Sequence, residues 1–187
     1  MPKDAIYEAT REVKTFVDLA HGADVLIGKA KADAQGSYYT VMSALLLTAF
    51  TFEAYLNHLG SERIKFWEEI EPLKVMSKYS VLCKDLNVVP DFSRRPYQTL
   101  TALFKFRNAI AHGRSVIVEQ STEVEFPYVP PMDGGPKTHW EEYCVLGNAE
   151  RSKEDISKTI TELHGAAGLG DYPFIHGVGS GSVTRKG

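Results

Sequence analysis

The chain has 187 residues, of which 43% are hydrophobic and 24% are charged, and its formal net charge at pH 7 is −3. This composition is typical of a soluble globular protein with one domain, long enough to bury a core without disulfides. The net charge excludes a protein that is basic as a whole, so any nucleic-acid binding requires a local cluster of positive side chains. Cys83 and Cys144 lie far apart without CxxC spacing and are expected to be buried or half-buried thiols.

The N-terminal third predicts two long helices. Residues 4–33 carry apolar side chains at helical spacing and predict an amphipathic helix. Residues 38–59 are apolar nearly all round, which predicts a central buried helix. The apolar run Val41–Phe52 inside it is too short to span a bilayer, and the charged first residues do not form a signal peptide. We therefore expect a cytoplasmic protein without a membrane partner.

Glycine and proline residues mark the boundaries of the next helices. Gly60 is expected to end the central helix, and Ser61 to open a short one. A helix is predicted over 72–86, with Pro72 in its first turn. Pro96 then begins a further helix, which Gly113 ends.

After this helix the hydrophobic pattern alternates, which predicts a small antiparallel β excursion over about 115–147. A last helix is expected over 152–164. We therefore predict a mainly α protein, a helical bundle with a β excursion before its last helix, in one domain over 1–165. Residues 166–187 are rich in Gly and Ser and predict a flexible tail.

Three polar residues stand out in the helix that begins at Pro96. Arg107 lies near the middle of its apolar stripe, with Asn108 and His112 on the edge of that stripe. Because a guanidinium stays charged, removing it from water without a partner costs several kcal/mol or more. Arg107 therefore needs either a buried carboxylate or an anionic ligand.

The central helix carries a charge of the opposite sign. Glu53 falls in the middle of an apolar face, with Asn57 one turn further on. We infer that Glu53 and Arg107 contact one another. Two interpretations follow: a salt bridge that only fixes the register of the helices, or a carboxylate that holds Arg107 in one rotamer beside a cleft.

His112 has a structural and a chemical interpretation. At a helix C-terminus its imidazole can simply bond the last carbonyl groups. Alternatively it transfers protons, with Asn108 one turn away to orient the ring. RNA cleavage at the ribose 2′-hydroxyl needs a base, an acid and a fixed cation for the charge on the phosphorane. His112 matches a proton-transfer group, and Arg107 matches the cation. Two copies of His112, one from each chain of a symmetric dimer, would supply both the base and the acid.

The segment Phe104–Gly113, with its Arg-Asn-x3-His motif, resembles the HEPN superfamily, as does Phe52–Asn57. The resemblance covers about residues 38–115. It implies an all-α, homodimeric, metal-independent endoribonuclease of a toxin–antitoxin or antiphage system, with catalytic Arg107 and His112 and a possible antitoxin or defence partner. Many family toxins carry Tyr two residues after the histidine, where this chain has Arg114.

Other residue patterns add less. Lys105 and Arg114 are candidate contacts to RNA phosphates. No His, Cys or acidic spacing typical of a zinc site occurs, so we expect no metal and no cofactor. Two alternatives to the nuclease stay open: an inactive HEPN-like module that binds RNA or a partner protein, and a purely structural helical dimer.

Overall fold

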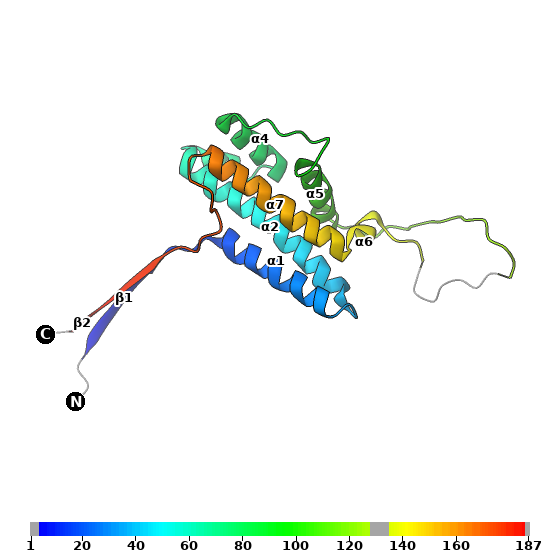
Figure 1. Cartoon of the computed structure of the whole chain (residues 1–187), viewed down its shortest axis with the longest axis horizontal. Helices are drawn as coiled ribbons and strands as arrows, with labels where there is room; N and C mark the ends of the chain where they lie inside the picture. The colour runs from blue at the N-terminus through cyan, green and yellow to red at the C-terminus, as the bar shows by residue number, and fades with distance from the viewer. Residues whose placement is uncertain (1–3, 128–134, 186–187) are drawn as a thin grey trace.

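The computed structural model describes residues 4–127 and 135–185. Within them the chain forms seven helices and two strands, so the mainly α prediction is confirmed (Figure 1). In chain order they are β1 (Ala5–Arg11), α1 (Thr15–Ala32), α2 (Ser37–Arg63), α3 (Trp67–Ile70), α4 (Val75–Leu86), α5 (Tyr97–Ala111), α6 (His139–Tyr143), α7 (Leu146–Ala166) and β2 (Gly179–Arg185).

Helix α2 is the centre of the bundle, as its nearly continuous apolar sequence predicted. It packs most extensively against α1 and α7, and it also contacts α4 and α5. By length and composition α2 is the one helix within the described residues that could cross a membrane. Half of its most apolar window is buried inside the bundle, as in the core helix of a soluble protein.

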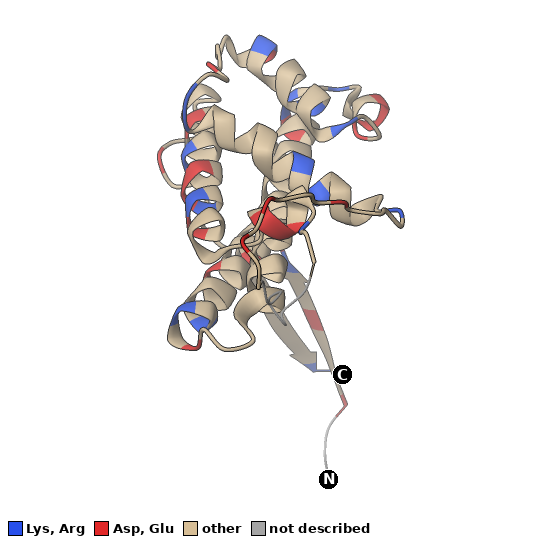
Figure 2. Ribbon diagram, turned by 90° about the vertical axis from the view of Figure 1, so that its right-hand side faces the viewer, with Lys and Arg blue, Asp and Glu red and all other residues tan. Residues whose placement is uncertain are grey.

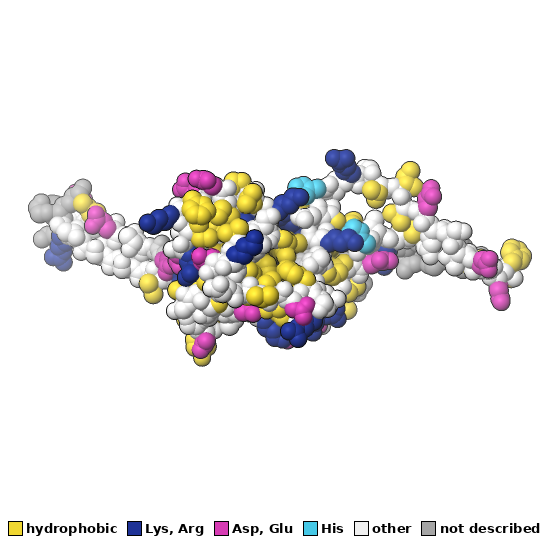
Figure 3. All heavy atoms as spheres, turned by 90° about the horizontal axis from the view of Figure 1, so that it is seen from above, with side chains coloured by type: hydrophobic (Ala, Val, Ile, Leu, Met, Phe, Trp, Pro, Cys, Tyr) yellow, Lys and Arg dark blue, Asp and Glu magenta, His cyan; other side chains and the backbone are white. Residues whose placement is uncertain are grey.

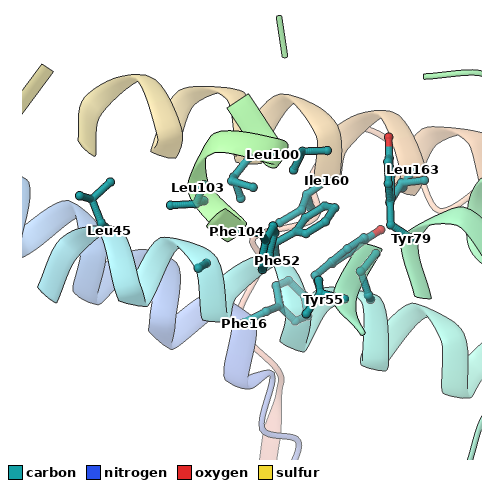
Figure 4. Close-up of a cluster of buried hydrophobic side chains, with 14 of the residues drawn as sticks. Phe16, Leu45, Phe52, Tyr55, Tyr79, Leu100, Leu103, Phe104, Ile160 and Leu163 are labelled. Atoms are coloured by element: carbon teal, nitrogen blue, oxygen red, sulfur yellow. The ribbon is translucent and has the colours of Figure 1, made fainter. Parts of the chain in front are cut away.

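An aromatic cluster joins α2 to α4 and α5 (Figure 4). The ring of Phe52 lies 5.4 Å from that of Tyr79 on α4 and 5.9 Å from that of Phe104 on α5, between centroids. All three side chains are buried. Because Glu53 follows Phe52 in the chain, this packing also fixes the place of Glu53 beside α4 and α5.

The predicted end of the central helix at Gly60 is wrong, because α2 continues to Arg63. A Cβ atom at position 60 would lie 2.3 Å from ring atoms of Trp67, so glycine allows the indole of α3 to pack closely against α2. Helix α4 likewise begins at Val75, three residues after Pro72. Helix α5 agrees with its prediction, since it begins after Pro96 and ends at Ala111, before Gly113.

The predicted β excursion is also wrong for the described part of 115–147. Residues 115–127 and 135–138 form no strand, and the following segment is helix α6; residues 128–134 lie outside the described residues. A capping box explains the helix: Glu141 N donates to Thr138 Oγ1 at 3.4 Å, and Thr138 N donates to Glu141 Oε2 at 2.7 Å. Helix α7 then begins at Leu146, six residues before the predicted start.

The two ends of the chain pair with each other, which corrects both terminal predictions. Strands β1 and β2 are antiparallel, with Ala5 opposite Arg185 and Arg11 opposite Gly179. Residues 5–11 are therefore not helical, and the expected flexible tail contains a strand. The two-stranded sheet extends away from the bundle, and every residue of both strands is exposed (Figure 1). Its partners are far apart in the sequence, so no local pattern signals the pairing.

Candidate active site

Glu53 and Arg107 are in direct contact, as predicted from the single charge on the apolar face of each helix. Arg107 Nη2 donates to Glu53 Oε2 at 2.9 Å. The side chains are 21% and 25% exposed, so the pair is partly desolvated rather than fully buried. Two helices that are distant in the sequence, α2 and α5, thereby place one carboxylate and one guanidinium together.

Lys78 of α4 completes this group, and the sequence analysis missed it. Its Nζ donates to Glu53 Oε1 at 2.9 Å and to Asn57 Oδ1 at 3.0 Å. The Lys78 side chain is only 1% exposed. The signal was present, because Lys78 sits between Val75 and Leu82 on the apolar stripe of α4, the same anomaly that identified Arg107.

The Arg107 guanidinium is held on several sides. Besides its bond to Glu53, Nη1 donates to Asn108 Oδ1 at 3.1 Å, and Cζ lies 5.7 Å from the ring centroid of Phe50. Its Nε is buried and has no hydrogen-bond partner among the described residues. The group is therefore fixed in orientation and retains an unused donor.

Arg107 opens into a pocket of about 330 Å³. The pocket lies between α5 and the start of α4 and is lined by Lys74, Val75, Met76, Phe104, Arg107, Asn108 and His112. Helix α4 has no side-chain cap at its N-terminus, so its first backbone N–H groups keep their partial positive charge. This end of the helix borders the pocket, because Lys74, Val75 and Met76 line it. The walls thus combine one fixed guanidinium, one lysine and a helix N-terminus, a combination that favours an anion.

His112 lies at the end of α5 and also lines this pocket. Its backbone N–H donates to the carbonyl of Asn108 at 3.0 Å, and its side chain is exposed. Asn108 Oδ1 accepts from Arg107, so the structure relates Asn108 to the guanidinium. The role of Asn108 in orienting the His112 ring stays a prediction.

The other predicted site residues have different positions. Asn57 does not line this pocket; its Oδ1 accepts from Lys78, and its Nδ2 donates to Glu71 at 3.5 Å. Lys105 and Arg114 are exposed and do not line the pocket, so their contact with phosphate stays a prediction. Within residues 4–127 and 135–185, no three His, Cys, Asp or Glu side chains gather as a metal site would require.

Charge is mixed over the surface of the bundle. Lys and Arg alternate with Asp and Glu along the helices (Figure 2). On the face seen from above, hydrophobic side chains lie next to Lys, Arg and His side chains (Figure 3). Any attraction for an anion is therefore local to a site, as the net charge of −3 requires.

No family model, curated protein or solved structure matches this chain.

Proposed function

We propose that this chain is a metal-independent endoribonuclease of the HEPN type that cleaves single-stranded RNA. One observation carries the proposal: Arg107, Asn108 and His112 line the same pocket as the positive end of α4, while Glu53 holds Arg107 in place. The pocket therefore offers a fixed cation for a phosphodiester and an imidazole for proton transfer.

The reaction needs no group beyond these side chains and the substrate. A His112 imidazole takes the proton of a ribose 2′-hydroxyl, and the 2′-oxygen attacks the adjacent phosphorus. Negative charge that builds on the phosphorane oxygens is stabilised by Arg107 and by the helix N-terminus. The bond from phosphorus to the 5′-oxygen then breaks as an imidazolium protonates that oxygen, which leaves a 2′,3′-cyclic phosphate and a free 5′-hydroxyl.

The two proton transfers require two imidazoles, which supports a homodimer. Each chain brings one His112 to the pocket. Ala111, which precedes it in the chain, is exposed, as is Phe50, whose ring centroid lies 5.7 Å from Arg107 Cζ. A two-fold contact would bring copies of Arg107, Asn108, Ala111 and His112 close to the axis. We place the dimer in the cytoplasm, as a toxin or antiphage effector that an antitoxin or defence protein can control.

Cleavage of single-stranded RNA in the presence of EDTA tests the proposal. We expect products with 2′,3′-cyclic phosphate ends, and we expect His112→Ala and Arg107→Ala each to lower the rate by about 10²-fold or more. His21→Ala is the control, because His21 is exposed on α1 and lines a different pocket. Cleavage that persists in His112→Ala, or that EDTA abolishes, would refute the mechanism. Binding of RNA without cleavage would favour the inactive binding module.

Mixing chains tests the dimer separately. When His112→Ala chains are added to wild-type chains, heterodimers with one imidazole should form and the total rate should fall. A wild-type protein that sediments as a monomer at micromolar concentration and still cleaves RNA would show that the second histidine is unnecessary.

A further inference from the structure

The ion pairs around Glu53 leave an excess of one positive charge. Lys78, Glu53 and Arg107, here called the charge cluster, contain two cations and one carboxylate. Each oxygen of Glu53 accepts from a different cation: Oε1 from Lys78 and Oε2 from Arg107, both at 2.9 Å. A carboxylate can accept two parallel bonds from one arginine, which neutralises that arginine most completely. In this cluster Glu53 makes only one bond to Arg107.

Lys78 is the rigid member of the charge cluster. Its side chain is 1% exposed and bonds to both Glu53 and Asn57, so it has little freedom to move away. Packing alone does not account for an ammonium here. An apolar side chain of similar length would fill the same space without the cost of removing a charge from water.

The position of Lys78 connects it to the pocket. Lys78 lies in the first turn of α4, and the residues just before it, Lys74 to Met76, form one wall of the pocket. Arg107 forms the opposite end of the same ion-pair chain and lines the pocket directly. A change of charge at Lys78 therefore acts on the pocket through Glu53 and Arg107, without contact between Lys78 and a ligand.

We propose that Lys78 is a positioning residue that keeps this pocket positive. By occupying Oε1, it limits Glu53 to a single bond with Arg107 and leaves the guanidinium free to bind the phosphodiester of a single-stranded nucleic acid. The choice of ligand rests on the proposed function. The excess of one positive charge follows from the contacts of the cluster alone.

Binding of a single-stranded oligodeoxynucleotide at low salt, followed by fluorescence anisotropy, tests this role. This probe has no 2′-hydroxyl and cannot be cleaved by the proposed reaction. Lys78→Met leaves the cluster neutral and should weaken binding about tenfold, as loss of a nearby buried charge predicts. Lys84→Met removes the same charge from an exposed position on α4 and should bind as the wild type does.

The double variant Glu53→Gln with Lys78→Met separates charge from structure. It restores the wild-type excess of one positive charge, so its affinity should return to within about threefold of the wild type. Both variants lack the bond between Lys78 and Glu53, so a role of that bond only as a structural tie predicts equally weak binding in the single and the double variant. Each variant is measured at a temperature where its own unfolding curve shows a folded protein.

Three outcomes would overturn the proposal: wild-type affinity in Lys78→Met, equal weakness in the single and double variants, or no binding by the wild type. The proposed nuclease can fail independently. If the affinities follow the expected order but RNA is not cut, Lys78 has the assigned role and the catalytic assignment is wrong. If RNA is cut and Lys78→Met binds normally, the reverse holds.

Discussion

Replacing Glu53 by alanine removes the carboxylate that pairs with two cations at once. Lys78 would suffer most, because its side chain is 1% exposed and would keep only its bond to Asn57. Arg107 is 21% exposed and keeps its bond to Asn108, so water and the neighbouring amide compensate part of its loss. Removing one partner of a buried ion pair costs about 3–5 kcal/mol. We expect Glu53→Ala to lower the free energy of unfolding by that amount, chiefly through Lys78.

Urea unfolding followed by circular dichroism measures this loss. With a slope of about 2 kcal/mol per molar urea, a loss of about 3–5 kcal/mol moves the midpoint down by about 1.5–2.5 M. Glu62→Ala is the matched control, because Glu62 is an exposed carboxylate on the same helix. Its midpoint should move by less than about 0.3 M.

The double variant Glu53→Ala with Lys78→Met identifies the source of the loss. Once the stranded ammonium is gone, part of the stability should return, so the two changes should not be additive. A midpoint shift below about 0.5 M in Glu53→Ala would refute the reasoning. Strictly additive losses would also refute it, because they would mean that Lys78 does not depend on Glu53.

Three further predictions follow from individual side chains. Gly60→Ala should destabilise the protein by about 1–3 kcal/mol in urea unfolding, because its Cβ would overlap the Trp67 ring. Gly28→Ala, with free space around it, should instead stabilise the protein slightly, and equal effects of the two changes would contradict this packing. Burial lowers the pKa of His164 below its usual 6.5, so the unfolded chain binds the proton more readily. Between pH 7.5 and 5.5 the wild-type midpoint should therefore fall more than that of His164→Phe, and parallel curves would exclude this role. Burial raises the pKa of the Cys144 thiol to about 11, so a thiol reagent at pH 8 should label it only as the chain unfolds, whereas fast labelling of the folded protein would show an accessible thiolate.

The sequence was most informative where a helix face is interrupted by a charge. Apolar periodicity determines which residues of a helix share a face, and an isolated charge on that face requires a partner. The apolar faces of α2 and α5, each with one charge, predicted the contact of Glu53 with Arg107. The apolar face of α4 carries the same signal at Lys78.

Other features were harder to predict. The pairing of β1 with β2 joins residues from opposite ends of the chain, so neither strand carries a local sign of its partner. Helix α6 was missed although Thr138 and Glu141 have capping-box spacing, because an alternating hydrophobic pattern was given more weight. Gly60 resembled a helix end, and only the position of the Trp67 ring explains why glycine is needed inside α2.

The position of the charge cluster beside the aromatic core has a consequence for binding. Phe52 packs against aromatic rings of α4 and α5, and Glu53, the next residue, bonds to one cation from each of these helices. Packing of the core therefore also sets the distances within the cluster. Arg107 is oriented when the protein folds, so under the proposed function a phosphodiester that enters the pocket would meet a guanidinium that has already lost most of its rotamer freedom. Affinity and any rate enhancement then depend less on ordering Arg107 at the moment of binding.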